Sequence, residues 1–389
     1  MQVLTKSKTY YSHLICSKHG DIYDKNILQT YSKANKPLIA QYYLDKQAKS
    51  EIINQAVHSM WRYRKVLPVE NDQNIVSLGE GMTPLIPLER LANQYGVSLL
   101  LKDEAYNPTG SFKARGLSMA ISKAKELGVK GCVIPTAGNA GGAMSAYCAK
   151  AGLDAYVYMP QKTPKTFAKE CEFFGAKVTY VDGNISDCAA QLKKDNLVDC
   201  FDISTLKEPF RIEGKKTMGY EIAEQMNWEV PDVVVYPTGG GTGLIGIWKA
   251  FEEMQKMGWI GNKMPRMVAV QTTACYPIVA AFNQGEKSAA PFKNPAVTRA
   301  NGLRVPAAFG DEIILDILYK SNGNALAISE EAILEGTKEM AQKESILLAP
   351  EGAAVWMAFK QLLAENWVKP REKVVLLNTG TIYKYMENF

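Results

Sequence analysis

The sequence predicts an α/β protein with two domains, each built on a mainly parallel sheet that helices cover. From residue 96 onward, short and wholly apolar segments alternate with segments of helical periodicity. Strands without a polar face are typical of parallel sheets that are covered on both sides. The chain has 389 residues, of which 47% are hydrophobic. A chain of that size is expected to divide into two domains rather than form one.

Apolar runs and helix-stopping glycines bound the expected elements. The expected strands are residues 97–101, 131–135, 155–159, 177–181, 232–236, 266–271 and 374–377. The expected helices are residues 44–64, 111–127, 140–151, 163–174, 214–226 and 243–257. The second and the fourth of these helices end at Gly128 and Gly175, since glycine is common just after a helix.

The domain boundaries follow from changes in this pattern. Residues 1–70 are poorly patterned, and we interpret them as an N-terminal extension. The stretch 228–231 is the clearest break in the alternation of strands and helices. We therefore expect a large domain from residues 71–113 and 231–389, and a smaller domain from residues 114–230.

Composition excludes several classes of function. The net charge of +5 is spread along the chain, and the basic clusters are mixed with acids, as at Lys207-Glu208. A nucleic-acid-binding protein needs a basic face or stripe, so we expect no nucleic-acid partner. No segment approaches the roughly 20 apolar residues that span a bilayer, and the N-terminus does not resemble a secretory signal. The seven scattered cysteines suggest reduced thiols in the core of a cytoplasmic protein.

Histidine is confined to His13, His19 and His58. A histidine-based catalytic triad or a histidine-rich metal centre is therefore not expected in the main body of the chain. Cys16 and His19 have the spacing of half a zinc knuckle, but residues 28–38 contain neither Cys nor His. We interpret this segment as an ordinary surface turn and expect no metal site.

The first loop that carries chemistry is Asn107-Pro108-Thr109-Gly110-Ser111-Phe112-Lys113. Its sequence predicts a turn, then Ser111 as a helix N-cap and Lys113 in the first helical turn. The helix macrodipole disfavours positive charge there, so a desolvated lysine loses its proton more readily, as an imine-forming lysine must. The alternative is a solvent-exposed lysine in a loop.

Two further loops follow expected strands and precede expected helices. Residues 135–142 read Pro-Thr-Ala-Gly-Asn-Ala-Gly-Gly, and their free N–H groups would bind a carboxylate or a phosphate, with Asn139 as an added donor. Residues 237–243 read Pro-Thr-Gly-Gly-Gly-Thr-Gly, which is typical of a phosphate cradle at a helix N-terminus. The alternative for the first of them is a glycine-rich turn that only allows close packing.

A reactive lysine, an anion nest and a phosphate cradle, without histidine, together fit a phosphate-bearing aldehyde cofactor held as an imine. These motifs resemble those of the fold-type II pyridoxal-phosphate enzymes, which have the fold of the tryptophan synthase β chain, and among them the threonine synthases. The resemblance runs from about residue 75 to residue 381 and is most specific at residues 107–116. Glu80-Gly81-Met82-Thr83-Pro84-Leu85 matches an opening motif of these enzymes.

The resemblance implies pyridoxal 5'-phosphate as the cofactor and a lyase activity that forms threonine from O-phosphohomoserine. Lys113 takes the role of the Schiff-base lysine, and Thr379, at the end of the last strand, faces the pyridine nitrogen. The other implied cofactor-binding residues are Asn139, Gly239, Gly240, Gly241, Thr242 and Gly243. The implied substrate-binding residues are Thr136, Ala137, Gly138, Asn139 and Ala140 for the carboxylate, and Arg211 for the phosphate.

The same resemblance implies a cytoplasmic homodimer that acts on a small, phosphorylated amino acid in amino-acid biosynthesis. Residues 1–70 resemble the cysteine-rich ribbon of some threonine synthases without its full set of metal ligands. Lys207, Lys215 and Lys216 lie near Arg211 and fit a solvated, charged helix start better than a phosphate site.

The chain departs from the threonine synthase pattern in several places, which leaves other activities open. Ala114 follows the lysine where many relatives have Asp, and Thr205 and Leu206 stand where Asn and Ser are usual. The triple glycine of residues 239–241 is more like that of serine and threonine dehydratases. The alternatives are therefore a serine or threonine dehydratase, a β-replacement enzyme, and a cofactor-binding protein without activity.

Overall fold

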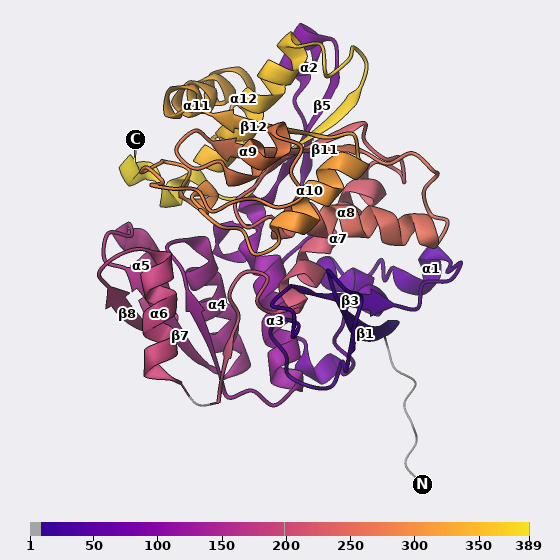
Figure 1. Ribbon diagram of the computed structural model, residues 1–389. Helices are drawn as coiled ribbons and strands as arrows, with labels where there is room; N and C mark the ends of the chain where they lie inside the picture. Colours follow the sequence, from indigo (N-terminus) through magenta and orange to yellow (C-terminus); the bar gives the residue numbers. More distant parts are fainter. Residues whose placement is uncertain (1–8, 198, 389) are drawn as a thin grey trace. The chain divides into compact units, whose positions relative to one another are not determined.

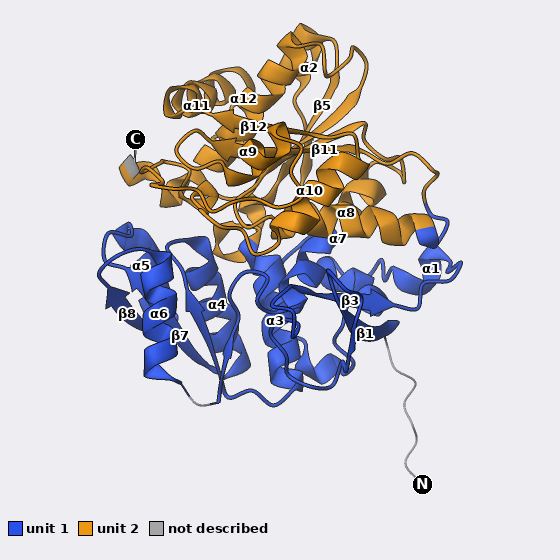
Figure 2. Cartoon of the chain, viewed as in Figure 1, with its two compact units in different colours: residues 1–82, 113–217, 256–259 blue, residues 83–112, 218–255, 260–389 orange. Residues whose placement is uncertain are grey.

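The computed structural model describes residues 9–197 and 199–388 (Figure 1). Contacts within the chain divide it into two compact units, which Figure 2 shows in different colours. Unit 1 contains residues 1–82, 113–217 and 256–259, and unit 2 contains residues 83–112, 218–255 and 260–389. Compact units are defined by contacts alone, so the division into an extension, a large domain and a small domain stays a prediction.

Unit 2 is built on a six-stranded sheet. Its strands, in spatial order, are β12 (Asn324–Ile328), β11 (Arg266–Thr272), β10 (Val233–Pro237), β13 (Lys373–Asn378), β5 (Ser98–Asp103) and β4 (Leu85–Pro87). All neighbours are parallel except β4 and β5. Val233 and Val235 of β10 face one side of the sheet and Val234 and Tyr236 the other, and all four are buried. Burial on both faces explains why this strand is apolar throughout.

Helices cover both faces of this sheet. They are α2 (Glu89–Tyr95), α8 (Thr242–Lys256), α9 (Pro277–Asn283), α10 (Asp311–Lys320), α11 (Glu330–Glu344) and α12 (Pro350–Ala364). Helices α2, α11 and α12 share one hydrophobic core with alternate residues of β5, β10, β11 and β13. Helices α11 and α12 lie side by side in Figure 1. Helix α12 is apolar almost throughout because it packs across four strands.

Unit 1 contains a four-stranded, wholly parallel sheet. Its strands, in spatial order, are β8 (Lys177–Val181), β7 (Asp154–Pro160), β6 (Gly131–Pro135) and β9 (Cys200–Asp202). The helices of this part are α3 (Lys113–Glu126), α4 (Asn139–Ala151), α5 (Lys165–Phe173), α6 (Ile185–Asp195) and α7 (Phe210–Gln225), the last of which continues into unit 2. Val133 and Tyr158 pack against α6, whereas Val157 lies beside Gly141 of α4. The predicted α/β class with mainly parallel sheets is confirmed in both units.

The N-terminal segment forms a small antiparallel sheet within unit 1. Its strands are β2 (Ile22–Tyr23), β1 (Tyr11–Cys16) and β3 (Leu38–Tyr42), in that spatial order. The sequence did not indicate this sheet, because the pairing of β1 with β3 shifts between Tyr11 and His13 and interrupts the alternation of apolar residues. The sheet packs on Met119 and Ala120 of α3 and on Phe210 at the start of α7.

The predicted helix at residues 44–64 is wrong. Only α1 (Lys49–Ile52) is α-helical there, and a 3₁₀ segment, η1, follows at Met60–Val66. Tertiary hydrogen bonds replace helical ones in between: the Asn54 N–H donates to the Arg62 carbonyl, and the Met60 N–H donates to the Glu80 carbonyl. The apolar spacing that suggested a helix arises because Met60, Trp61 and Tyr63 are buried in this irregular segment.

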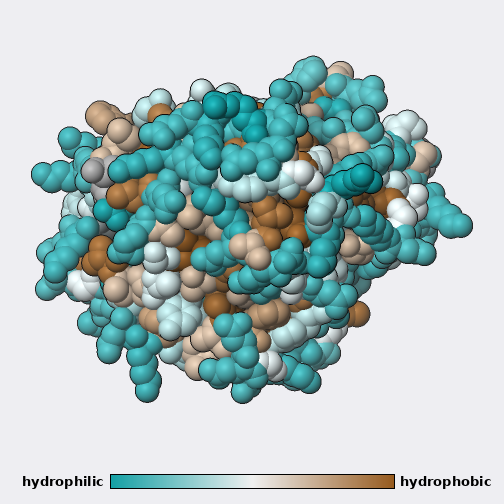
Figure 3. All heavy atoms as spheres, turned by 90° about the horizontal axis from the view of Figure 1, so that it is seen from above, coloured by the Kyte–Doolittle hydropathy of each residue, from teal (hydrophilic) through white to brown (hydrophobic). Residues whose placement is uncertain are grey.

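Within the described residues, no helix is both long and apolar enough to cross a membrane. Figure 3 shows polar side chains dispersed over one face of the molecule, with apolar side chains between them. All seven cysteines are free thiols, and six of them are buried, as the scattered spacing predicted.

Candidate functional site

The candidate cofactor residues of unit 2 lie at one edge of its six-stranded sheet. Strands β10, β13 and β5 are neighbours and run parallel, so their carboxyl ends meet at the same edge. The glycine-rich loop follows β10, Thr379 follows β13, and the loop 104–112 follows β5. Ligand sites in parallel α/β sheets are found at this edge. The structure therefore brings these three predicted segments together.

The loop before Lys113 is hydrogen-bonded to the end of the chain's last strand. The Phe112 N–H donates to the Thr379 carbonyl over 3.1 Å, and the Thr381 N–H donates to the Gly110 carbonyl over 2.8 Å. Ser111 and Gly380 form an antiparallel bridge between these two bonds. Lys113 follows Phe112 directly in the chain, so the position of this loop fixes where the lysine's main chain begins.

Helix α3 begins at Lys113 itself and not at Ser111. The prediction of Ser111 as an N-cap is wrong, because its buried hydroxyl group has no hydrogen-bond partner. The hydroxyl group of Thr109 on the same loop is also buried without a partner. Buried hydroxyl groups are normally satisfied, so two orphaned ones on the loop that leads to Lys113 fit a polar ligand at this place.

The glycine-rich loop accepts no side chains at its ends. A Cβ atom on Gly239 would lie 2.2 Å from the Gly302 carbonyl oxygen, and one on Gly243 would lie 1.8 Å from the Tyr236 hydroxyl oxygen. Gly241 has a φ of +76°, in the left-handed region. The loop leads into α8, whose first turn starts at Thr242 and has N–H groups without helical partners. A 15-residue helix with such a start fits a phosphate group.

The end of β13 is braced by polar groups that the sequence analysis missed. The Asn378 amide group donates to Asp103 over 2.8 Å and accepts from the Ala349 N–H over 3.2 Å. Burial, more than any other cause, raises the pKa of Asp103. Thr379 is the next residue and is buried. Asp103 and Asn378 are polar residues at the ends of two apolar strands, and this pattern is the sequence signal that could have indicated their contact.

In unit 1 the candidate substrate loops also follow neighbouring parallel strands. The segment from Thr136 to Ala140 follows β6, and the segment that ends at Arg211 follows β9, which pairs with β6. Gly138 is the N-cap of α4, and no side chain caps this helix. Thr136 accepts from the Gly138 N–H over 3.3 Å, and Asn139 is the first residue of the helix. The uncapped first turn of α4 is suited to a carboxylate.

Arg211 is completely buried in the first turn of α7. Its Nη1 atom donates to the Ile203 carbonyl over 2.8 Å, whereas Nε and Nη2 have no hydrogen-bond partner. Among the described residues it forms no ion pair. A buried guanidinium group normally pairs with an anion. Two unsatisfied, adjacent nitrogens therefore mark a place for a ligand with at least two acceptor oxygens.

The expectation of a solvated helix start around Arg211 is wrong. Helix α7 begins at Phe210 rather than at residue 214, and both Lys215 and Lys216 are completely buried. Lys216 forms an ion pair with Glu213 over 2.7 Å and lies 3.7 Å from the centre of the Tyr42 ring. No local pattern in the sequence indicates this burial, because it depends on the N-terminal sheet that supplies Tyr42.

Two glycines let α3 and α7 approach closely within unit 1. A Cβ atom on Gly116 would lie 3.1 Å from the Arg211 carbonyl oxygen, and one on Gly214 would lie 2.0 Å from the Arg115 carbonyl oxygen. Gly116 is three residues after Lys113 and therefore lies on the same face of α3. The first turn of α3, which Lys113 begins, thus packs against the residue that carries the orphaned guanidinium group.

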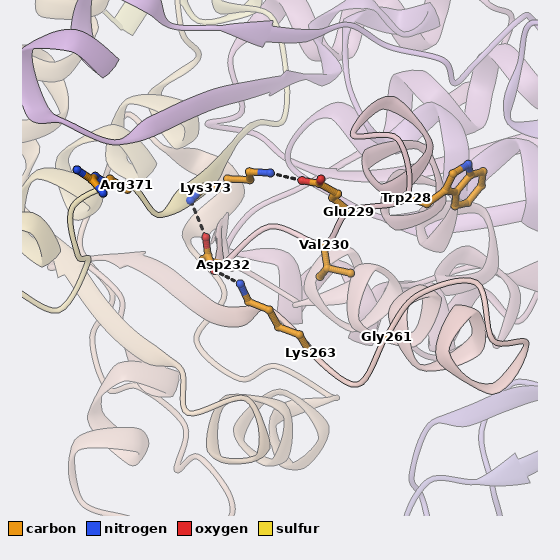
Figure 4. A pocket seen from close by; sticks show the side chains of 8 residues that line it. All are labelled: Trp228, Glu229, Val230, Asp232, Gly261, Lys263, Arg371 and Lys373. Carbon is orange, nitrogen blue, oxygen red and sulfur yellow. Dashed lines mark hydrogen bonds and ion pairs between the residues drawn. The ribbon is translucent and has the colours of Figure 1, made fainter.

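A surface hollow of about 320 Å³ in unit 2 lies away from these loops. It surrounds Asp232 and Lys373, which stand at the amino ends of β10 and β13. Figure 4 shows two ion pairs in it: Lys373 contacts Glu229, and Lys263 contacts Asp232. Arg371, which also lines the hollow, is exposed. The hollow is at the edge of the sheet opposite to the glycine-rich loop. No cluster of three possible metal ligands occurs among the described residues.

Comparison with known proteins gives one consistent family. The model of the pyridoxal-phosphate-dependent enzymes matches residues 76–380. The chain belongs to this family. The threonine synthase of Methanocaldococcus jannaschii is 35% identical over 94% of this chain and 91% of its own length. The threonine synthase of Methanosarcina acetivorans is 33% identical over 96% of this chain and 92% of its own length.

Solved structures share the fold. Maize serine racemase superposes with a TM-score of 0.66 at 20% identity, over 79% of this chain and 93% of that chain. A likeness at this identity supports the fold-type II architecture and not a substrate. Pyridoxal phosphate is the cofactor of the family, and the orphaned hydroxyl groups and the glycine-rich loop of this chain fit its phosphate and polar ring atoms. The roles of the individual site residues stay predictions.

Proposed function

We propose that this chain is a threonine synthase, which converts O-phosphohomoserine to threonine and phosphate. The observation that carries the proposal is Arg211, a fully buried guanidinium group with two unpartnered nitrogens, in a chain whose relatives are threonine synthases. A serine or threonine dehydratase needs no second phosphate site and would leave this cation unneutralised. The substrate phosphate supplies the missing anion.

The remaining roles are those that the resemblance to threonine synthases implies for each segment. Lys113 holds the cofactor, Gly239 to Gly243 bind its phosphate, and Asn139 and Thr379 contact its ring oxygen and ring nitrogen. When bound, pyridoxal phosphate withdraws electrons from the substrate's Cα and so acidifies its proton. The N-terminal turn of α4, from Thr136 to Ala140, binds the substrate carboxylate.

Lys113 moves protons during the reaction. With its Nζ atom free, Lys113 would take the proton from Cα of the substrate and then serve at Cβ. The γ-phosphate leaves towards Arg211, and water adds at Cβ.

We also propose that the protein is a cytoplasmic homodimer, on the resemblance to threonine synthases.

A second candidate, a serine or threonine dehydratase, is favoured by one feature. The triple glycine at residues 239–241 is of the dehydratase type, and the Gly239 position has no room for a side chain beside the Gly302 carbonyl group. This loop binds the cofactor in both classes of enzyme. It therefore weighs less than Arg211, whose two unpartnered side-chain nitrogens a second anion would satisfy.

The test is to supply the purified holoenzyme with O-phosphohomoserine, threonine or serine, and to follow phosphate, threonine and 2-oxo acid. Phosphate and threonine in equal amounts from O-phosphohomoserine are the expected products. Arg211→Gln should then raise KM for O-phosphohomoserine by about 100-fold, the loss of one charge-assisted contact to a dianion. Oxo acid from threonine or serine, with O-phosphohomoserine inert, would replace the proposal with the dehydratase.

Lys113→Ala separates catalysis from cofactor binding. The variant should lose the imine absorbance band and at least about 1,000-fold in kcat, because both the covalent link and the base are removed. Lys123→Ala is a matched control on the same helix, since Lys123 pairs with Glu126 at its far end. The control should keep both the band and the activity.

A further inference from the structure

An acid and a base are buried together at the start of α7 without forming an ion pair. Glu208 and Arg211 are both almost completely inaccessible. Glu208 accepts hydrogen bonds from the Phe210 N–H, over 2.7 Å, and from the Arg211 N–H, over 3.0 Å. The Arg211 guanidinium group points its Nη1 to Ile203 instead. The carboxyl group of Glu208 thus occupies the end of the helix where an external anion would otherwise bind.

The groups around Glu208 leave its charge poorly compensated. Burial, only partly offset by Arg211 and the two N–H donors, raises the pKa of Glu208 to about 7. Lys215 is the other cation that acts on it, and the Cys132 thiol of β6 also lies within its field. The charge of Asp202 of β9 also acts on Arg211. A doubly charged anion beside Arg211 would be repelled by the carboxylates of Asp202 and of an ionised Glu208.

We propose that Glu208 couples anion binding at Arg211 to a proton: a doubly charged anion, such as a phosphate monoester, binds together with one proton that Glu208 takes from solvent. The inference rests on the proposed function in one respect, which is that Arg211 receives the substrate phosphate. With Glu208 neutral, the two charges of the anion face Arg211 and Lys215. With Glu208 ionised, the same anion meets an additional negative charge at the helix start.

The coupling has a defined direction. Below pH 7 the carboxyl group is already protonated in the free protein, so the affinity for a dianion is constant there. Above pH 7 each binding event must first add a proton, so the affinity falls as the pH rises. A singly charged anion is less affected, and Glu208 therefore makes the selectivity of the site for phosphate over carboxylate depend on pH.

Sulfate is the probe that isolates this effect, because it stays doubly charged across the whole range, whereas phosphate itself titrates. Calorimetry with the holoenzyme, whose cofactor phosphate fills the glycine-rich loop, measures the dissociation constant between pH 6.5 and 8.5. In the wild type this constant should rise about 25-fold over that range. In Glu208→Gln it should stay at the low-pH value throughout.

Glu253→Gln is the matched control, because Glu253 is a buried carboxylate in unit 2 that pairs with Tyr220 and Lys249. This variant should keep the wild-type pH dependence. A constant that does not change with pH in the wild type, or a Glu208→Gln variant with an undiminished slope, overturns the inference.

A second measurement needs no variant at position 208. Sulfate binding at pH 8 in two buffers of different ionisation enthalpy gives the number of protons taken up, and we expect close to one proton per sulfate. An uptake of zero contradicts the coupling even if Glu208→Gln does not fold.

Arg211→Gln distinguishes the two proposals: if sulfate binds this variant as tightly as the wild type, the phosphate site itself is misplaced and the proposed function fails. If binding is lost in Arg211→Gln but is independent of pH in the wild type, only the role of Glu208 fails.

Discussion

Two buried cations, one in each unit, are held in opposite ways. In unit 2, Lys102 of β5 forms an ion pair with Glu221 over 2.8 Å and also donates to the Thr83 carbonyl and to Gln225. In unit 1, the side chain of Arg211 has one hydrogen-bond partner among the described residues, the Ile203 carbonyl group, and two unsatisfied nitrogens. Neither side chain is exposed.

The difference separates a structural charge from a binding charge. All three protons of the Lys102 ammonium group have an acceptor within the chain, so this pair holds β5 to α7 and offers a ligand nothing. The Arg211 guanidinium group has donors to spare, so its desolvation is balanced only when an anion arrives. The desolvation of Lys102 is balanced by partners within the protein, whereas that of Arg211 is balanced by a ligand.

The largest expected effect is on the paired cation. Lys102→Met removes the cation that pairs with the buried Glu221 carboxylate and should lower the free energy of unfolding by about 3–5 kcal/mol. Urea denaturation at pH 7 measures it. In the double variant Lys102→Met, Glu221→Leu most of that loss should be regained, because both charges are gone. A double variant as unstable as the single one would show that the pair is not what matters.

Glu208 gives the next largest effect, on the pH dependence of stability. Its pKa is about 7 in the folded chain and ordinarily 4.5, so the folded state holds its proton more tightly than the unfolded state does. The stabilisation is complete below pH 4.5 and is lost as the pH rises to 7. Wild type should therefore lose about 3 kcal/mol relative to Glu208→Gln between pH 4.5 and 8. Equal slopes of unfolding free energy against pH for the two proteins would contradict this assignment.

Arg211→Met, unlike Lys102→Met, should affect ligand binding much more than stability. Removal of an unpaired buried charge should change the free energy of unfolding by no more than about 1 kcal/mol. The same variant should lose about 2.7 kcal/mol, or about 100-fold, in its affinity for a phosphate ligand. Thermal denaturation without and with phosphate separates the two effects. A large loss of stability in the ligand-free variant would instead make Arg211 a structural residue.

The smallest effect is expected at Tyr42, whose hydroxyl group donates to Glu213 over 2.7 Å. Tyr42→Phe keeps the ring over Lys216 but removes this bond to a buried carboxylate, and should cost about 1.5 kcal/mol of stability. Tyr43→Phe is the control, because Tyr43 is exposed and should be neutral. Equal denaturation midpoints for the two variants would show that Glu213 is satisfied without the N-terminal sheet.

The sequence predicts the parallel core well because its signal is local. Strands β6 and β8 have the predicted bounds, and β13 differs by one residue at each end. Strands β6 and β13 are buried along nearly their whole length, which explains their apolar sequences, whereas β8 lies at the edge of its sheet and is partly exposed. The glycine-rich loop and Lys113 were recognisable for the same reason: each motif is contiguous and stands next to such a strand.

What the sequence does not reveal depends on distant partners. The burial of Lys215 and Lys216 requires the N-terminal sheet, and the orphaned state of Arg211 requires that Glu208 bind main-chain N–H groups instead of the guanidinium group. Ser111 likewise does not cap α3, because it forms a β-bridge with Gly380, which lies 269 residues later in the chain. No local pattern encodes such contacts.

The position of β13 has a consequence for folding while the protein is being synthesised. This strand lies between β10 and β5 in the sheet, yet it is synthesised well after both of them, about 140 and 270 residues later in the chain. Until it leaves the ribosome, β5 and β10 each present an unpaired edge, and such edges invite pairing with other chains. The loop before Lys113 also waits for Thr379 and Thr381, its hydrogen-bonding partners. A nascent chain that stalls shortly before residue 373 would therefore be both inactive and prone to aggregate.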